Sequence, residues 1–437
     1  MSSTADSGAW KAVGAWWMAT VLLLFYILSL TDRLIVSMLI APIQAELGLS
    51  DLQMSLLVGP AFAIIYAIGG LPSGWAADHW HRRWVIFCGV ILWSLASAMS
   101  GLAQGFAVLF ALRLLVGVGE AALTPAAYSL IADKFPRKRL ATALAFYTMG
   151  AKLGTAFAFA AGGWAFAVAA KGIELPFIGQ LSSWRATWLM IAAPGLLLAF
   201  LVFTFSEPPR AKRAKSKGPP FAELFAYIRR NGRLFGLIMT GFAMVGTVSG
   251  ALAGWVPTYL TRQFGWTPVE YGPVMGVVSL AVSLSLMPKG LIVDWLHGKG
   301  MPDIYLRFFT WLLGVTIFVL AAAFMMRTPT PFLVFYAIAN MAALSVTLFA
   351  SAIIQSVAPS HLRGQLTALY LATINVFTGL GPVAVAAVTD LVFRDKNRLG
   401  ESLAYTGVSL LICAFVLLRL ALRQWRRSDP TESAPAA

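Results

Sequence analysis

The sequence contains few charged residues, and this scarcity limits the possible classes of protein more than any other property of the composition. Only 12% of its 437 residues are Asp, Glu, Lys or Arg, whereas 59% are apolar. An ordinary water-soluble domain carries about 25% charged residues, so this class is excluded. Long apolar segments separated by short polar connections indicate a chain that crosses a membrane several times.

Cysteine and histidine are also scarce, with two and four residues respectively. Cys88 and Cys413 both fall in apolar segments without a metal or redox spacing, which favours simple packing. The sequence has no G-x-S-x-G, no Walker phosphate loop, no H-E-x-x-H and no paired catalytic carboxylates in a hydrophilic domain. We therefore predict no metal, no cofactor and no enzymatic activity.

Twelve apolar segments are each long enough, at about 20 residues, to cross a bilayer as a helix. No alternating pattern typical of a membrane β-barrel is present. The first segment is too long for a cleavable signal peptide and has no small-residue cleavage site. The predicted spans are residues 16–40, 54–77, 84–104, 107–131, 140–170, 185–206, 233–262, 269–292, 304–326, 331–357, 363–392 and 401–425.

The net charge of +15 follows the predicted topology. If both termini are cytoplasmic, 23 of the 33 Lys and Arg lie on the cytoplasmic side and seven on the opposite side. The other three, Arg33, Arg113 and Lys152, lie within spans. This asymmetry is the positive-inside rule, so nucleic-acid binding is not needed to explain the charge. We predict a multi-pass protein of the plasma membrane, such as a bacterial inner membrane.

A polar segment divides the spans into six and six. Residues 206–220, SEPPRAKRAKSKGPP, contain four prolines and five basic residues and cannot form a spanning helix. The following FAELFAYIRR is amphipathic; it either lies along the inner membrane surface or extends the seventh span. We predict a six-helix bundle over 1–205, a cytoplasmic linker with an amphipathic helix over 206–231, and a second six-helix bundle over 232–437.

The two halves repeat short motifs at equivalent points. Gly74 and Asp78 end the second span, and Gly290 and Asp294 end the eighth, 216 positions later. Thr-Ala-Leu follows the fourth span at 142–144 and the tenth at 367–369, an offset of 225. These matches indicate two parallel halves of related structure.

Ionisable residues within spans are the main candidates for function, because charge at membrane depth is costly. Arg113, Gly117 and Glu120 share one helix face, with the two charges about 10 Å apart along the axis. Asp32 and Arg33 lie about two-thirds along the first span. The alternative is a static ion-pair network that holds the first and fourth spans together.

Further candidates line the same predicted cavity. Lys152, near the middle of the fifth span, either faces the cavity and favours an anionic group or extends to the membrane surface. Four polar or aromatic residues are possible substrate contacts, although each is also compatible with packing; these are Tyr26, Tyr147, Tyr370 and Asn375. Gly150 and Gly154 indicate a close helix contact rather than a ligand site.

GWAADHWHRR, residues 74–83, resembles the loop signature of the major facilitator superfamily, and R-x-x-x-G-x-G-E from Arg113 resembles its second signature. The resemblance implies an all-α membrane fold of twelve transmembrane helices in two six-helix bundles. It also implies a cytoplasmic gate, in which the glycine permits close helix approach and the acidic and basic residues pair. The expected gate residues are Gly74, Asp78, Arg82, Arg83, Asp133 and Asp294.

Four segments are similar to the Spinster-like branch of that superfamily: Asp32-Arg33, VGVGEAALTPAAYSLIADKFP, GALAGWVPTYL and NVFTGLGPVAVAAVTD. This resemblance implies a proton-coupled secondary transporter of amphipathic, anionic or zwitterionic molecules such as lysolipids. The alternatives are a multidrug–proton antiporter and an organic-anion–proton symporter.

The predicted coupling site consists of Asp32 and Glu120 as proton carriers, Arg113 as the group that tunes them, and Arg33 as counter-ion or substrate ligand. Its expected partners are a small-molecule substrate, protons and the lipid bilayer, with no nucleic acid, and the chain is expected to be a monomer.

Overall fold

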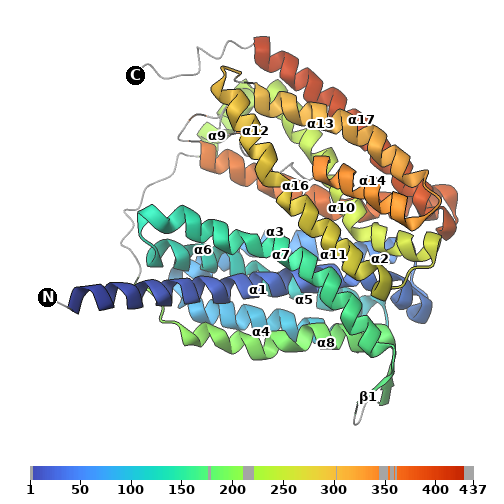
Figure 1. Cartoon of the computed structure of the whole chain (residues 1–437), viewed down its shortest axis with the longest axis horizontal. Helices are drawn as coiled ribbons and strands as arrows, with labels where there is room; N and C mark the ends of the chain where they lie inside the picture. The colour runs from blue at the N-terminus through green and yellow to red at the C-terminus, as the bar shows by residue number, and fades with distance from the viewer. Residues whose placement is uncertain are drawn as a thin grey trace. The chain divides into compact units, whose positions relative to one another are not determined.

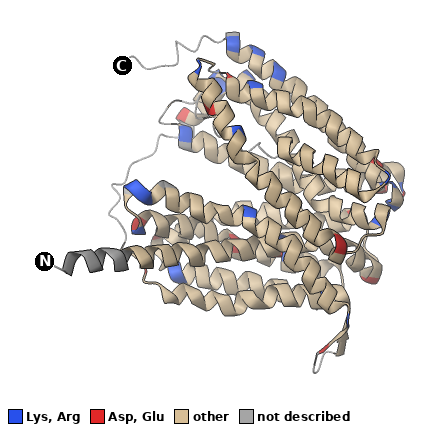
Figure 2. Cartoon of the chain, viewed as in Figure 1, with Lys and Arg blue, Asp and Glu red and all other residues tan. Residues whose placement is uncertain are grey.

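The computed structural model describes residues 3–175, 179–209, 221–301, 303–343, 353–354, 359 and 362–427. Among them, eleven helices are long and apolar enough to cross a membrane, and they coincide with eleven of the twelve predicted spans. The tenth predicted span, 331–357, is represented by α14 (Pro329–Ala343), and most of its remainder lies outside the described residues. Figure 2 shows that the charged residues lie mainly near helix ends and in connections.

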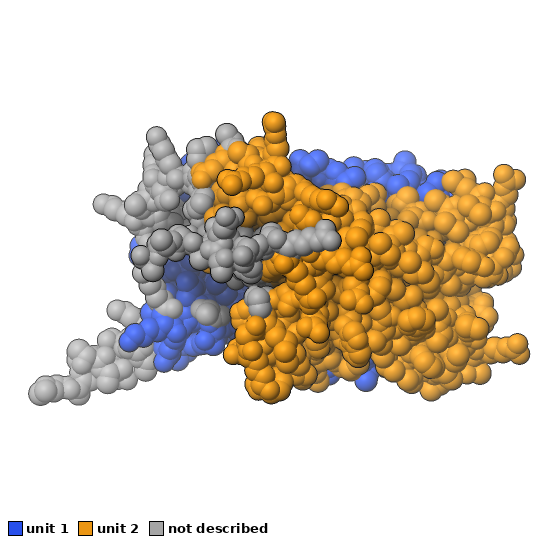
Figure 3. All heavy atoms as spheres, turned by 90° about the horizontal axis from the view of Figure 1, so that it is seen from above, with its two compact units in different colours: residues 1–213, 265–280 blue, residues 214–264, 281–437 orange. Residues whose placement is uncertain are grey.

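The chain divides into two compact units, each containing residues from two segments (Figure 3). Unit 1 is Met1–Arg213 with Gly265–Leu280, and unit 2 is Ala214–Phe264 with Ala281–Ala437. The predicted bundle boundaries at residues 205 and 232 stay predictions. Residues 210–220 of the predicted linker lie outside the described part of the chain.

The first part of the chain, up to Thr204, is helical except for one short hairpin (Figure 1). Strands β1 and β2 pair antiparallel, with Ile173 opposite Leu181. The elements are α1 (Ser3–Leu47), α2 (Asp51–Val58), α3 (Pro60–His79), α4 (Arg82–Ser100), α5 (Phe106–Ala121), α6 (Leu123–Lys134), α7 (Arg137–Ala169), β1 (Ile173–Leu175), β2 (Gly179–Leu181), α8 (Ser183–Leu198) and the 3₁₀ helix η1 (Ala199–Thr204).

The later elements are again helical. Besides α14 they are α9 (Phe221–Arg230), α10 (Gly232–Phe264), α11 (Pro268–Leu284), α12 (Leu286–Gly298), α13 (Ile304–Phe324), α16 (Arg363–Ala387), the π-helical η2 (Val388–Phe393), the 3₁₀ helix η3 (Lys396–Arg398) and α17 (Leu399–Arg427). Helices dominate because a helix satisfies its own backbone hydrogen bonds, which lipid cannot do.

The fourth and eighth predicted spans are each interrupted shortly before a proline. Helix α5 ends at Ala121, four residues before Pro125, and α11 ends at Leu284, four residues before Pro288. A proline has no N–H to donate to the carbonyl four residues earlier, and its ring collides with that carbonyl. The fourth and eighth spans therefore each consist of two consecutive helices.

Within unit 1, α1 packs against α7 and α8, and α4 packs against α5 and α8. Glycines allow the α1–α7 approach. A Cβ atom added at Gly150 would lie 3.0 Å from the Tyr26 side chain, and one at Gly154 would lie 2.8 Å from Leu30. The prediction that these glycines form a close helix contact is confirmed.

Unit 1 also contains a tight contact between α7 and the first part of α11. A Cβ atom added at Gly163 would lie 2.7 Å from the Pro268 carbonyl oxygen, and one at Gly272 would lie 2.6 Å from that of Phe159. Tyr271 adds a hydrogen bond of 3.0 Å to the Met38 carbonyl oxygen. Backbone therefore packs directly on backbone along this face of α7.

Unit 2 is organised around α10, which packs against α16 and α17. The α10–α16 contact is extremely close. A Cβ atom added at Gly250 would lie 1.9 Å from the Thr378 carbonyl oxygen, and one at Gly381 would lie 2.1 Å from that of Thr247. No other residue type fits at either position without separating the two helices.

The amphipathic segment forms a helix of its own rather than a continuous extension of the seventh span. Helix α9 ends at Arg230, Asn231 forms a turn, and α10 begins at Gly232. The Tyr227 and Phe235 rings pack edge to face across this turn, with centroids 5.6 Å apart.

Substitution of Gly250 or Gly381 by alanine should destabilise the protein by about 1–3 kcal/mol, because the added methyl group overpacks the α10–α16 contact. Thermal melting in one detergent measures the effect. Gly236→Ala is the matched control, since it lies in α10 with no atom within 4 Å of the added Cβ. Equal melting temperatures for all three variants would contradict the packing argument.

The predicted topology can be tested by cysteine labelling. The two native cysteines, both exposed, are first replaced by alanine. Single cysteines at Lys217 and Lys396 should then react with a membrane-impermeant reagent from opposite sides of the membrane. Labelling of both positions from the same side would refute cytoplasmic termini combined with twelve spans.

Candidate functional site

A buried ion pair joins α1 to α5 in unit 1. Arg33 Nη2 lies 2.9 Å from Glu120 Oε2, and the Ser29 hydroxyl donates to the same oxygen at 2.6 Å. The Glu120 side chain is 0% exposed, whereas that of Arg33 is 30% exposed. Glu120 Oε1 is buried and has no hydrogen-bond partner among the described residues. The two carboxylate oxygens of Glu120 therefore have different environments.

Asp32 points to a different neighbour, because consecutive helical residues differ in direction by about 100°. Its Oδ1 accepts a hydrogen bond of 2.9 Å from Ser97 of α4. Ser97 in turn accepts one of 3.1 Å from the Trp188 indole N–H. Since an indole can only donate, the Ser97 hydrogen is directed at Asp32. Asp32 is 3% exposed.

Arg113 lies beside this site without an ion pair. Its guanidinium donates to the backbone oxygens of Asp32 at 3.4 Å and Arg33 at 3.3 Å. It also lies 5.8 Å from the Trp188 ring. No carboxylate of the described residues lies within 4.0 Å of it. Arg113 is 1% exposed and acts on the two carboxylates only through space.

The Arg33 guanidinium lies against aromatic rings. Its guanidinium carbon is 4.1 Å from the Phe62 centroid and 5.1 Å from that of Tyr66. Tyr26 and Tyr147 stack at 5.0 Å, and Tyr128 meets Tyr147 edge to face at 5.6 Å. Tyr26 and Tyr66 are half-buried and Tyr128 is exposed, whereas Phe62 and Tyr147 are buried packing residues.

Lys152 lies on the face of α7 that packs against α11. Ala156 and Gly163, at four and eleven residues further on, share that face and contact α11. Lys152 is thus one turn beyond the α7–α11 contact; it is exposed and has no ion pair within the described residues. It is about 22 Å from Arg137 and 25 Å from Ala169, which is too far for a lysine to reach past either end of α7.

The remaining predicted contacts, Tyr370 and Asn375, lie on α16 in unit 2. Tyr370 is 1% exposed and packs edge to face on Phe242, with centroids 6.0 Å apart. Asn375 is exposed. Tyr370 is thus a packing residue of its unit, whereas the Asn375 side chain is accessible.

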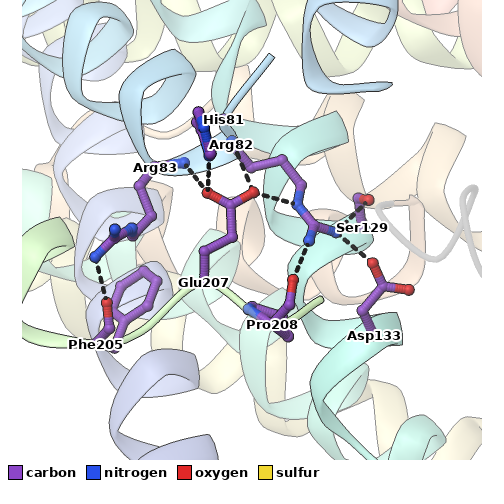
Figure 4. Close-up of polar contacts among 8 residues, drawn as sticks. All are labelled: His81, Arg82, Arg83, Ser129, Asp133, Phe205, Glu207 and Pro208. Carbon is purple, nitrogen blue, oxygen red and sulfur yellow. Dashed lines mark hydrogen bonds and ion pairs between the residues drawn. The ribbon is translucent and has the colours of Figure 1, made fainter. Parts of the chain in front are cut away.

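A second polar cluster lies where α4 begins (Figure 4). The Arg82 side chain is 0% exposed and forms an ion pair with Asp133 at the end of α6. It also donates to Ser129 at 3.0 Å, to Glu207 at 3.0 Å and to the Pro208 carbonyl oxygen at 2.8 Å. This fully buried guanidinium is bonded at every nitrogen, and it joins α4 to α6 and to residues 207–208.

Glu207 caps α4 from a distant part of the chain. His81, the residue before α4, provides no side-chain cap. Instead, the Glu207 carboxylate accepts from the backbone N–H groups of Arg82 at 3.1 Å and Arg83 at 3.5 Å. A carboxylate is favourable at a helix N-terminus, where backbone N–H groups are unpaired. Arg83 donates to the Phe205 carbonyl oxygen at 2.9 Å.

These contacts alter the acidity of Glu207. Burial raises the pKa of its carboxyl, but the hydrogen bonds from the backbone and side chain of Arg82 and from the backbone of Arg83 outweigh burial. The resulting pKa lies below the ordinary value. The ionised form is therefore the one that the fold stabilises.

The other predicted gate residues do not join this cluster. Asp78 is exposed and has no ion pair with another described residue. A Cβ added at Gly74 would meet no described atom within 4 Å, and the close approach expected there stays a prediction. Asp294 accepts a hydrogen bond of 2.8 Å from Tyr305 within unit 2.

Several contributors were missed from the sequence. Ser29 precedes Arg33 by four residues, so it lies on the same helix face, and this spacing could have identified it. Ser97, Trp188, Phe62 and Tyr66 come from other helices, and no pattern in the sequence links them to the site. Glu207 was assigned to the linker rather than to the gate.

Comparison with known proteins places this helical arrangement in a family. The family model described as Major Facilitator Superfamily matches residues 22–382. The chain belongs to the Major Facilitator Superfamily. It is therefore a multi-pass membrane transporter and not an enzyme, and the predicted fold class is confirmed. Among the described residues, no group of three or more His, Cys, Asp or Glu could hold a metal ion.

Relatives in the superfamily are named for different functions. The D-galactonate transporter of Escherichia coli O6:H1 is 28% identical over 62% of this chain and 64% of its own length. An MFS-type efflux pump of Mycolicibacterium smegmatis is 25% identical over 96% of this chain and 94% of its own. Protein spinster homolog 1 of Xenopus tropicalis is 30% identical over 56% of this chain and 45% of its own. The chain thus spans less than two thirds of two of these relatives.

Solved structures agree with the superfamily fold. A bacterial homologue of the human lysosomal transporter Spinster, inward-facing and unoccupied, superposes with a TM-score of 0.78 at 23% identity, over 97% of this chain and 99% of that one. A D-xylose–proton symporter gives a TM-score of 0.67 at 16% identity, over 96% and 99%. At these identities the likeness shows the fold alone. Together with the Spinster relatives, it confirms the predicted resemblance to that branch.

Neutralising Glu207 should weaken the cap on α4. Glu207→Gln is expected to lower the melting temperature at pH 7 by about 2–4 °C, because hydrogen bonds to a charged group are replaced by neutral ones. Glu174→Gln, the same change at an exposed hairpin residue, should have no effect.

The same variant should show a distinctive pH dependence. Because folding lowers its pKa, Glu207 stabilises the protein fully above the unfolded value of about 4.3. That contribution is lost as the pH falls from there through the lower folded value. The difference in melting temperature between wild type and Glu207→Gln should therefore shrink below about pH 4.3. A difference that stays constant down to pH 3 would show that the carboxylate charge is unimportant.

Proposed function

We propose that this superfamily member is a proton-coupled transporter of anionic organic molecules, with Glu120 and Asp32 as proton carriers and Arg33 as the anion ligand. One observation supports this most strongly. Arg33 is the partly exposed partner of a wholly buried carboxylate, so the charge of Glu120 determines whether Arg33 is available to another anion.

The coupling step follows from electrostatics. While Glu120 is ionised, the Arg33–Glu120 pair is neutral and has little attraction for an anion. A proton on Glu120 Oε1, the oxygen without a hydrogen bond from a described residue, neutralises the carboxyl and leaves the Arg33 charge uncompensated. Arg33 then binds the substrate anion, so proton and anion are carried together. Release of the proton restores the internal ion pair and expels the anion.

Asp32 and Arg113 complete this scheme. Asp32 has one fixed donor, Ser97, and no ion pair within the described residues, so it can exchange a proton without breaking a salt bridge. Arg113, buried beside this site, donates to the backbone oxygens of Asp32 and Arg33 and so holds this part of α1 against α5. Lys152, exposed beyond the α7–α11 contact, adds a second cation for an anionic group.

The surface around Arg33 supports two classes of anion. The accessible parts of the Tyr26, Tyr66 and Tyr128 rings suit an amphipathic substrate with an apolar part, in line with the Spinster relatives. The phenol groups of Tyr66 and Tyr128 could instead hydrogen-bond a hydroxylated acid, the class for which the D-galactonate relative is named. The anionic group on Arg33 is common to both, and we favour the amphipathic class because of the stacked rings.

Transport by protein reconstituted in liposomes tests the proposal. A pH gradient should drive uptake of a lysophosphatidylglycerol or of D-galactonate, but not of a cationic dye. Glu120→Gln mimics the protonated carboxyl, so it should keep pH-independent anion binding and lose gradient-driven accumulation. Asp32→Asn should also lose accumulation, and Arg113→Ala should in addition destabilise unit 1, because it removes the cation beside two buried carboxyl groups.

Glu270→Gln is the matched control, since Glu270 is exposed and bonds only locally to Thr267 among the described residues. It should transport like the wild type. Full gradient dependence in both Glu120→Gln and Asp32→Asn would show that coupling does not depend on these residues. Transport of the cationic dye alone would instead favour the multidrug antiporter.

A further inference from the structure

Unit 2 carries a groove along α13 and α17 that the proposed transport mechanism does not use. Its volume is about 570 Å³. A second groove of about 420 Å³ continues along α17 and shares Phe415 and Arg419 with the first. The two form one continuous depression, which we call the α13–α17 groove.

The floor of the groove is formed by a glycine and a ring. A Cβ atom added at Gly314 would lie 3.2 Å from the Phe415 ring, so the absent side chain makes room for it. On α13, Trp311 is 68% exposed and Phe318 78% exposed, at a spacing of seven residues on one helix face. Large exposed apolar residues on a transmembrane helix indicate a surface that faces lipid acyl chains.

One end of the groove is strongly basic. Arg307 lies in the first turn of α13, four residues before Trp311, and Arg419 follows Phe415 by four residues on α17. Both arginines are exposed, as is Arg423 one turn further along α17. Figure 2 shows basic residues along the C-terminal part of α17. Each helix therefore presents an apolar stripe that ends in arginine.

The antiparallel packing of the helices brings these basic ends together. The Arg426–Asp303 ion pair, with Nη2 and Oδ2 2.6 Å apart, joins the end of α17 to the residue before α13. This pair also neutralises the nearest acidic group. Arg307, Arg419 and Arg423 have no acidic partner among the described residues, and Arg419 lies over the Phe415 ring at 5.3 Å.

We propose that the α13–α17 groove binds one anionic phospholipid of the surrounding bilayer. The phosphodiester lies between Arg307 and Arg419, with Arg423 as an additional contact, and the acyl chains run over Phe415, Trp311 and Phe318. Basic pockets between transmembrane helices on the inner side recognise such headgroups through charge. In the predicted topology the ends of α13 and α17 concerned lie on the cytoplasmic side.

The chemistry favours a lipid over a free anion. A small phosphate would use the arginines but leave the adjoining apolar surface in contact with lipid or detergent. A phospholipid has its anionic headgroup at one end and its apolar chains at the other. The groove likewise has arginines at one end and apolar side chains along the rest. The site shares no residue with the proposed coupling site, so this inference does not depend on the proposed function.

Native mass spectrometry of the full chain in detergent tests the proposal, with phosphatidylglycerol, cardiolipin and phosphatidylcholine as added lipids. We expect one phosphatidylglycerol or cardiolipin to be retained in preference to phosphatidylcholine. Arg307→Gln with Arg419→Gln should weaken that binding by about 30-fold, since each arginine near a membrane surface contributes a factor of about five. Both residues are exposed, so the melting temperature in detergent should not change.

The matched control is Arg229→Gln with Arg230→Gln, which removes two exposed arginines of α9 in the same unit. This pair should leave the affinity unchanged within twofold. Equal losses in both double variants would show non-specific attraction and overturn the site, as would equal retention of phosphatidylcholine. Displacement of the lipid by millimolar inorganic phosphate would show a free-anion site and overturn the lipid assignment.

Discussion

The need to compensate buried charge governs the organisation of unit 1. A carboxylate or guanidinium placed among apolar helices without a partner is costly, and removing one member of a buried pair typically costs about 3–5 kcal/mol. Glu120 is therefore held by Arg33 and Ser29 of α1, and Arg82 is held by Asp133, Ser129 and Glu207.

The two clusters differ in one important respect. Arg82 is fully enclosed and bonded on every nitrogen, which suits a static joint. Arg33 instead remains partly exposed, and one oxygen of its partner Glu120 has no hydrogen bond from a described residue. Similar charges thus hold helices together in one cluster and form the proposed proton switch in the other.

The secondary structure was largely predictable from the sequence, because a long apolar segment that crosses a bilayer must form a helix to satisfy its backbone hydrogen bonds. The two proline breaks follow the same local logic, and the Thr-Ala-Leu and Gly-x-x-x-Asp repeats mark the related halves. The close contacts of Gly150 and Gly154 were also predictable, since small residues spaced by four indicate helix packing.

The side-chain partners were much less predictable. Arg33 was expected as a counter-ion or a substrate ligand, but its direct contact with Glu120 of another helix did not follow from any spacing in the sequence. Neighbouring residues Asp32 and Arg33 diverge to α4 and α5 because the helix rotates by about 100° per residue. Glu207 was assigned to a linker by its prolines and basic neighbours, although it completes a helix end 125 positions earlier. Such pairings depend on which helices become neighbours, and that information is not contained in local spacing.

The cap that Glu207 provides has a consequence for biosynthesis. The first turn of α4 leaves the ribosome 125 residues before the carboxylate that closes it. At a synthesis rate of about 5–20 residues per second, this delay is about 6–25 seconds. During that interval the nascent chain holds the Arg82 guanidinium near the membrane surface without two of its final acceptors. Completion of the sixth span then supplies both, so unit 1 closes only after the whole of its N-terminal segment has been inserted.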